Sequence, residues 1–181
     1  MRDTKLGDEG YFDSPESRGR GSFDESLLRE PVSVLRAQKL LVFSMTTAVT
    51  EAMRAMKRDH CGCVIVTEDG TPDSKVTGIF TERDVLFRIV DQGRNPAQLP
   101  LAEVMTPDPD TLSVRSSVAY ALNKMSVGGF RHIPIVDAEY RPAFVVSVRN
   151  VVEFLVESFP REVLNLPPVE GVKPQRAREG A

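Results

Sequence analysis

The chain has 181 residues, of which 41% are hydrophobic and 27% are charged, and its formal net charge is −3. This length allows one ordinary hydrophobic core or two small ones, and it leaves no space for a large catalytic domain beside them. A slightly negative net charge does not favour binding to the phosphate backbone of DNA or RNA, so no nucleic-acid partner is expected.

The sequence also lacks the signals of export or membrane insertion. No apolar run approaches the ~18 to 20 residues that a membrane-spanning helix needs, and the opening segment MRDTKLGDEG lacks the apolar core of a secretory signal. Cys61 and Cys63 are separated only by Gly62, which makes a disulfide between them geometrically awkward. These observations predict a cytoplasmic protein with no membrane partner.

The first ordered elements are expected after a polar leader. Residues 1–30 are predicted to form a disordered N-terminal arm, because they bury too little apolar surface to offset their ordering entropy. Residues 32–35 then indicate a short helical turn, and residues 40–43 indicate a brief extended piece. Thr46 or Thr47 is placed to cap a helix. The inner face of that helix is predicted to comprise Val49, Ala52, Met53 and Met56.

Two strands and a further helix are predicted next. The first strand covers residues 63–66 (CVIV) and the second covers residues 76–80 (VTGIF), where Gly78 lacks a Cβ and so allows another backbone or a ligand to come close. Thr81 follows at a position where its hydroxyl caps a helix. The apolar spacing that defines this helix comes from Val85, Leu86, Ile89 and Val90.

The same order of elements returns in the second half of the chain. A helix capped by Ser116 or Ser117 and a strand at residues 133–136 (IPIV) follow their counterparts at almost the same interval along the chain. The helix face has the same spacing as the first and comprises Val118, Ala121, Leu122 and Met125. An interval this constant over several elements indicates an internal repeat.

The repeat includes the junction between the last strand and the last helix, since the interval from Thr81 to Ser147 equals the interval from Asp84 to Asn150. The predicted organisation is therefore an α/β (α+β) protein with two β-α-β-β-α units.

The units are placed at residues 31–95 and 100–159, with a Gly- and Pro-containing linker between them. Residues 160–181 are predicted to be a mostly disordered tail.

The paired units resemble a tandem of cystathionine β-synthase (CBS) domains. The resemblance rests on the repeated junction, which reads GIFTERD at residues 78–84 and FVVSVRN at residues 144–150, and on VMTP at 104–107 and RHIPIVD at 131–137. It covers residues 31–158. Two copies in order are far more specific than any single motif.

The resemblance implies a pseudo-twofold module, often called a Bateman module, with two clefts between its units. Such modules commonly bind AMP, ADP or ATP, and sometimes NAD or S-adenosylmethionine. They commonly form homodimers, and they regulate a target without catalysing a reaction. The resemblance therefore implies a stand-alone regulatory pair that is not an enzyme, requires no cofactor and signals to an unidentified partner protein in trans.

Residues 81–84 (TERD) have two interpretations. In one, Thr81 caps the helix and Asp84 folds back to the N–H of the cap, which needs no ligand. In the other, the Thr81 hydroxyl and the N–H groups of the helix start meet phosphate or ribose, and the Asp84 carboxylate accepts both ribose hydroxyls. Spacing alone favours the cap, while Gly78 and the family resemblance favour the ligand.

The second copy departs from this pattern. Asn150 replaces the carboxylate acceptor with a neutral amide, and Phe144 stands where the first copy has Gly78. We therefore expect the cleft served by Thr81 and Asp84 to bind adenosine ligands better than the other cleft.

Basic and apolar residues complete the predicted site. Arg131 and His132 precede a strand and, by the resemblance, face the cleft, where a planar guanidinium can grip phosphate oxygens in two places; as isolated residues they also fit an ordinary surface. Val64, Ile65, Ile79 and Pro134 would supply apolar walls for an adenine, although such residues usually belong to a core. The predicted nucleotide-binding set is Thr47, Val64, Ile65, Gly78, Ile79, Thr81, Arg83, Asp84, Arg131, His132, Pro134, Ser147, Arg149 and Asn150.

Two alternatives to a nucleotide sensor stay open. One is a ligand-free interaction module with degenerate clefts. The other is a thiol or metal sensor built on Cys61 and Cys63, near His60; because the only other histidine is His132, a closed set of four zinc ligands is not evident. Small cysteines at a strand start more often pack in a core. No nucleophile–base motif or phosphate-binding loop appears, which disfavours an enzyme.

Overall fold

The two halves of the chain fold into two similar lobes. The computed structural model describes residues 26–36 and 39–159, so the predicted tail and positions 1–25 of the predicted arm lie outside the described residues. The end of that arm forms α1 (Ser26–Arg29), and Leu28 of this helix packs against the core of the second lobe. The segment predicted to be disordered is therefore helical from Ser26 to Arg29.

The first lobe has the predicted order of strands and helices. Its elements are β1 (Val42–Ser44), α2 (Val49–Asp59), β2 (Cys63–Thr67), β3 (Val76–Thr81), α3 (Glu82–Asp84) and η3 (Val85–Val90), followed by η4 (Pro96–Gln98) in the linker. β1 runs parallel to β2, and β3 runs antiparallel to β2. The short β4 (Thr106–Pro107) joins the same sheet beside β3.

The second lobe repeats this arrangement. Its elements are β5 (Leu112–Ser113), α4 (Val118–Gly128), β6 (His132–Val136), β7 (Pro142–Ser147) and α5 (Val148–Ser158). β5 is parallel to β6, and β6 is antiparallel to β7. In both hairpins the register is interrupted just before the last pair of residues. The predicted α/β class with two repeats is therefore confirmed.

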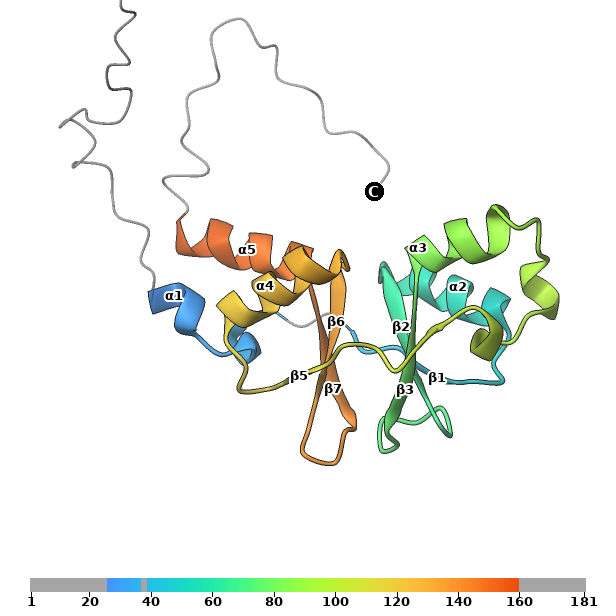
Figure 1. The fold of residues 1–181 in the computed structure, drawn as a ribbon, viewed down its shortest axis with the longest axis horizontal. Helices are drawn as coiled ribbons and strands as arrows, with labels where there is room; N and C mark the ends of the chain where they lie inside the picture. The colour runs from blue at the N-terminus through green and yellow to red at the C-terminus, as the bar shows by residue number, and fades with distance from the viewer. Residues whose placement is uncertain (1–25, 37–38, 160–181) are drawn as a thin grey trace, which may run out of the picture.

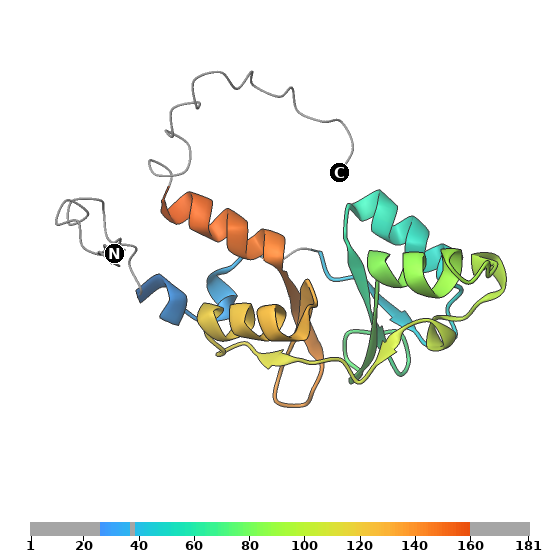
Figure 2. The ribbon, with the colours of Figure 1, turned by 45° about the horizontal axis from the view of Figure 1, so that its top comes forward.

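The hairpins of the two lobes pack against each other. Figures 1 and 2 show β2–β3 and β6–β7 side by side at the centre of the molecule, with the helices outside them. Ile65 and Ile79 from the first sheet form one apolar cluster with Val136 and Val145 from the second. β2 is buried over its whole length because one face meets its own helices and the other meets the second lobe.

A short helical turn precedes each lobe in the chain, and each of these entry turns packs on the other lobe. η2 (Val32–Val34) precedes the first lobe, but Val32 is buried in the core of the second, where its N–H donates to the Ser116 carbonyl at 2.8 Å. η5 (Leu101–Glu103) precedes the second lobe, but Leu101 is buried in the core of the first. Each core is therefore completed by a segment from the other half of the chain.

Polar residues cap several helices through their side chains. Thr81, Ser117 and Ser147 each accept a hydrogen bond from the backbone N–H three positions later, at the starts of α3, α4 and α5. The predicted caps at Thr81 and Ser117 are confirmed.

The predicted side-chain cap of α2 is wrong. The hydroxyls of Thr46 and Thr47 lie 3.0 and 3.1 Å from Ser44 Oγ and do not cap the helix. Instead, the N–H of Val49 donates to the carbonyl of Leu99 at 2.9 Å. A backbone acceptor from the linker replaces the side-chain cap, and the sequence around α2 contains no sign of it.

The helix after Thr81 leaves part of its apolar face uncovered. It continues from α3 into the wider π-type turns of η3, which shift the side chains relative to a regular helix. Ile89 is buried in the core, whereas Leu86 and Val90 are 59% and 65% exposed. This helix therefore presents apolar surface outside the core of its own lobe.

Gly78 serves packing within the first sheet. It pairs with Pro107 of β4, and a Cβ at Gly78 would lie 2.4 Å from the sulfur of Met105. The close approach that the missing Cβ allows is made by the chain itself.

Candidate functional site

A cleft of about 1080 Å³ lies between the two lobes. The end of β3 and the start of α3 form its first wall, the turn between α4 and β6 forms its second, and the segment between β4 and β5 forms its third. The lining consists of Gly62, Ile79, Thr81, Glu82, Arg83, Asp84, Leu86, Phe87, Arg88, Thr106, Asp108, Pro109, Asp110, Gly129, Phe130, Arg131 and His132. A molecule bound here would touch both repeats.

Part of the predicted nucleotide-binding set meets in this cleft. The members that line it are Ile79, Thr81, Arg83, Asp84, Arg131 and His132. Asp84 belongs to the first repeat and Arg131 to the second, so a carboxylate and a guanidinium from different repeats border the same space.

The other eight members of the predicted set lie outside this lining, and three of them, Ser147, Arg149 and Asn150, belong to the matching junction of the second repeat. Val64 and Ile65 are fully buried in β2, where they fill the first core and the contact between the lobes. Pro134 is buried in β6, Thr47 lies beside Ser44, and Gly78 lies beneath Met105. Ordinary core packing accounts for the apolar residues among them.

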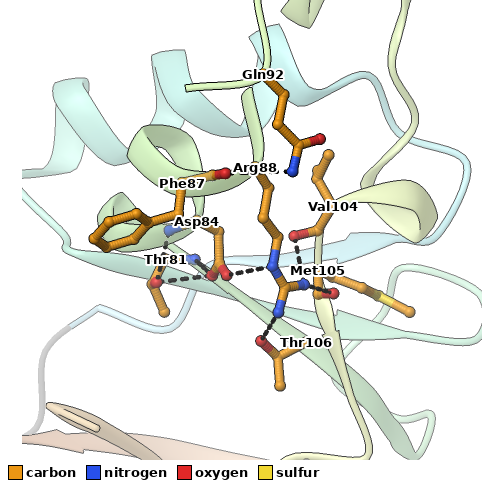
Figure 3. A network of polar contacts seen from close by, with 8 residues as sticks. All are labelled: Thr81, Asp84, Phe87, Arg88, Gln92, Val104, Met105 and Thr106. Carbon is orange, nitrogen blue, oxygen red and sulfur yellow. Dashed lines mark hydrogen bonds and ion pairs between the residues drawn. The ribbon is translucent and has the colours of Figure 1, made fainter. Parts of the chain in front are cut away.

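Thr81 and Asp84 form a reciprocal cap at the start of α3 (Figure 3). Asp84 Oδ2 accepts hydrogen bonds from the Thr81 N–H and from the Thr81 hydroxyl, both at 2.8 Å. The N–H of Glu82 donates to the Gly62 carbonyl at 3.1 Å, so the helix start already uses part of its donor capacity. The structural interpretation of this motif is therefore correct.

Arg88 is a member of this site that the sequence analysis missed. Its Nε lies 3.2 Å from Asp84 Oδ1, and its terminal nitrogens donate to the Val104 carbonyl at 3.0 Å, to the Met105 carbonyl and to the Thr106 hydroxyl at 3.1 Å (Figure 3). It thus ties the helix of the first repeat to the segment that enters the second. The i, i+4 spacing of Asp84 and Arg88 was the available signal, since such pairs are neighbours on a helix.

Arg83 connects the two walls of the cleft. Its guanidinium donates to the carbonyl of Gly129, at the end of α4, at 3.1 Å. The same guanidinium lies over the ring of Phe87, 5.6 Å from the ring centre. Arg83 is therefore engaged by one partner in each repeat.

Arg131 and His132 form the opposite wall. The imidazole of His132 packs against Gly62, where a Cβ would come within 2.9 Å of Nε2. Burial and the neighbouring Arg131 lower the pKa of His132, so the imidazole is neutral at pH 7. Arg131 is exposed, and its side chain has no hydrogen-bond or ion-pair partner among residues 26–36 and 39–159.

A smaller hollow of about 280 Å³ is lined by the repeat counterparts of the cleft residues. Arg149 and Asn150, the counterparts of Arg83 and Asp84 in the second repeat, form one of its walls. Asn150 Oδ1 accepts from the Ser147 N–H at 2.8 Å and from the Ser147 hydroxyl at 2.7 Å. The amide therefore makes the same cap as the carboxylate in the first repeat.

Two polar side chains of the smaller hollow are bonded to neighbouring protein groups. The Asn150 amide donates to the Arg36 carbonyl at 2.8 Å, and Arg149 pairs with Glu153 at 2.8 Å. This hollow is smaller than the cleft, and its Arg149 and Asn150 side chains already have protein partners. The preference for the cleft at Thr81 and Asp84 remains a prediction that binding measurements have to test.

Cys61 and Cys63 are buried free thiols. Burial raises the pKa of Cys61, and it raises the pKa of Cys63 to about 12, so both thiols stay protonated at neutral pH. Within the described part of the chain, no group of three or more His, Cys, Asp or Glu residues is arranged to hold a metal ion. None of the helices described there combines the length and apolar character needed to span a bilayer.

Two β-α-β-β-α repeats with a cleft between them define a paired α/β module. The family model for the CBS domain matches residues 32–91 and again residues 101–157. The chain therefore belongs to the CBS domain family, and the predicted tandem is confirmed.

Known proteins similar to this chain share the same module. The CBS domain-containing protein CBSCBSPB3 of Arabidopsis thaliana is 30% identical over 113 residues, which make up 62% of this chain and 20% of that protein. This chain spans about a fifth or less of the length of the first curated relatives.

Solved structures support the same fold. An uncharacterized conserved protein from Pyrococcus horikoshii has a TM-score of 0.63 and 25% identity, covering 80% of this chain and 98% of its own. The CBS domain protein PAE2072 from Pyrobaculum aerophilum, complexed with AMP, has a TM-score of 0.60 and 23% identity, covering 70% and 96%. The CBS domain pair of MJ0100, in complex with 5′-methylthioadenosine and S-adenosyl-L-methionine, has a TM-score of 0.57 and 18% identity, covering 66% and 94%.

The substitution Arg88→Met tests the link between the helix and the entry segment. It keeps the apolar stem and removes the guanidinium, so Asp84 and three oxygen acceptors lose a charged donor. Because the Arg88 side chain is 39% exposed and water replaces part of this loss, we expect the free energy of unfolding to fall by about 1–2 kcal/mol. Urea denaturation measures the change.

Arg149→Met is the matched control, because it removes a surface guanidinium that pairs with Glu153. Its cost should be below about 0.5 kcal/mol. Equal losses in the two variants would show that Arg88 contributes no more than a surface ion pair.

Proposed function

We propose that this chain is a cytoplasmic, non-catalytic regulatory protein that senses an adenosine-containing ligand in the cleft between its CBS repeats. The candidate ligands are AMP, ADP, ATP, NAD and S-adenosylmethionine. The observation that carries the proposal is that Asp84 and Arg131, from different repeats, border one cleft of about 1080 Å³. The complexes of PAE2072 with AMP and of MJ0100 with adenosine derivatives support the ligand class.

Asp84 provides the acceptor for ribose. A carboxylate oxygen accepts about two hydrogen bonds, and Oδ1 receives one, from Arg88. One ribose hydroxyl can therefore bind Oδ1 without disturbing the helix cap. A second hydroxyl takes the place of the Thr81 hydroxyl on Oδ2, and the Thr81 N–H keeps its bond to that oxygen.

The second repeat provides the partners for phosphate, and both repeats provide contacts for the base. The exposed guanidinium of Arg131 can donate two parallel hydrogen bonds to one phosphate group. The neutral His132 beside it adds a further N–H donor. Ile79 and Phe130 line the same cleft and offer apolar contact to an adenine.

Ligand occupancy reaches the surface through α3 and η3. Leu86 and Phe87 line the cleft, and both are more than half exposed. Arg83 lies over Phe87 and holds Gly129 of the second repeat, so a ligand that engages Arg83 changes contacts on both sides. A ligand shifts such an equilibrium only through different affinities for its two states, which contact with both repeats makes possible.

A second copy of this chain covers the exposed apolar face that Leu86 and Val152 form. Leu86 of η3 and Val152 of α5 are counterparts in the two repeats, and they are 59% and 51% exposed. Both helices lie on the same side of the central sheets (Figure 1). Equivalent faces on a pseudo-twofold module form the self-complementary surface that an isologous dimer requires. The dimer in turn can pass the ligand signal to a target protein.

The double substitution Leu86→Asp and Val152→Asp tests the homodimer. Two carboxylates in an apolar contact are costly to bury, so we expect the variant to sediment as a monomer at concentrations where the parent chain is a dimer. Analytical ultracentrifugation gives the masses. Tyr140→Asp, in the turn between β6 and β7 at the far end of the sheets, is the control and should leave the dimer intact. A monomeric parent chain would rule out this part of the proposal.

A thermal-shift screen with AMP, ADP, ATP, NAD and S-adenosylmethionine tests the sensor itself. A ligand present at a hundred times its dissociation constant stabilises the folded state by ~2.7 kcal/mol, which raises the melting temperature measurably. We expect a shift with at least one of the five. The exposed apolar faces also suit an interaction module without a ligand, and absence of any shift would favour that alternative.

Asp84→Asn separates the role of the carboxylate in binding from its role in folding. The cap should survive, because Asn150 makes the same cap in the second repeat. We expect affinity for the ligand found in the screen to fall about ten- to a hundredfold, since a hydrogen bond to a charged group contributes about 1.5–3 kcal/mol. Titration calorimetry measures the affinity. Glu153→Gln, which removes a carboxylate from the smaller hollow, is the control and should leave the affinity unchanged; equal affinities in all three proteins would remove Asp84 from the site.

A further inference from the structure

The positive charge that the cleft offers to a ligand is limited, because two of its three arginines are engaged. Arg88 is bonded to Asp84 and to three oxygens of the entry segment. Arg83 is bonded to the Gly129 carbonyl. Arg131 is exposed, and its guanidinium has no hydrogen-bond or ion-pair partner within residues 26–36 and 39–159. One guanidinium is therefore ready to bind an anion without breaking a contact.

His132, beside Arg131, adds no positive charge to the cleft. His132 is partly buried, which disfavours the charged imidazole, and its neighbour Arg131 further disfavours a second positive charge. At neutral pH His132 therefore acts as a neutral donor. A single phosphate matches this pair of groups well.

The cleft also contains unpaired negative charge. The carboxylates of Glu82 and Asp108 line it and have no hydrogen-bond or ion-pair partner among the residues that the structure describes. Asp84 is balanced by Arg88, and Asp110 is balanced by a lysine of α4 at 2.6 Å. The unpaired charges that face a ligand are therefore one positive and two negative.

We infer that the cleft selects an adenosine ligand with a single phosphate over one with a diphosphate or triphosphate chain. This inference rests on the proposed function. The first phosphate meets Arg131, but each further phosphate adds negative charge to a space where Glu82 and Asp108 are the remaining unpaired groups. Like charges a few ångströms apart repel even when solvent screens them. The second and third phosphates therefore lower affinity.

Titration calorimetry with adenosine, AMP, ADP and ATP, in metal-free buffer at neutral pH, tests this selectivity. We expect AMP to bind at least about tenfold more tightly than ATP, with ADP between them, and more tightly than adenosine. If ATP binds as tightly as AMP or more tightly, the selectivity is wrong while the nucleotide sensor stands. If none of the four binds, the proposed nucleotide function and this inference fail together.

Variants that replace carboxylates with amides test which residues cause the preference for AMP over ATP. Glu82→Gln combined with Asp108→Asn should narrow the ratio of AMP to ATP affinity by about tenfold. Glu68→Gln combined with Asp73→Asn makes the same change in charge in the turn between β2 and β3, outside the cleft, and should leave the ratio unchanged. Equal ratios in the two double variants would overturn the assignment to Glu82 and Asp108.

Arg131→Gln tests the other half of the inference. It should weaken AMP about tenfold and leave adenosine binding unchanged, because only the phosphate contacts this guanidinium. Unchanged AMP affinity would show that Arg131 is not the phosphate partner and would overturn the charge argument.

Discussion

The exchange of entry turns between the lobes is the constraint on which the rest of the structure depends. Val32 and Leu101 are fully buried, each in the core of the lobe that its segment does not lead into. Separating the lobes would therefore open both cores. Burial of such a side chain contributes about 1.5–3 kcal/mol, and this stabilisation would be lost for each. The two central hairpins therefore stay packed together, and the cleft is lined by residues of both lobes.

Within that frame, one short motif serves both folding and the candidate site. Thr81 and Asp84 satisfy the start of a helix, and Arg88 extends the same network to the entry of the second repeat. The second repeat shows that an asparagine meets the capping requirement equally well. The carboxylate in the first repeat is therefore not required by the cap, and its charge is one difference between equivalent positions of the two repeats.

Features set by neighbouring residues were predicted well from the sequence. The repeat, the strands and the caps at Thr81 and Ser117 follow from local patterns of apolar and polar residues, and the structure confirms them. The cap of α2 was not predictable, because the acceptor is the carbonyl of Leu99, which lies far away in the chain, in the linker between the repeats. Arg88 was missed for the same reason: three of its partners belong to the segment that enters the next repeat.

The sequence by itself determined that this chain holds two copies of one β-α-β-β-α unit, because periodicity and capping are written in adjacent residues. It also supplied the residue types of the candidate site. Only the tertiary structure decided that Asp84 and Arg131 share a cleft, that Val64 and Ile65 belong to the core, and which charges are already paired. These facts depend on how segments distant in the chain pack, and packing geometry is not encoded in any local pattern.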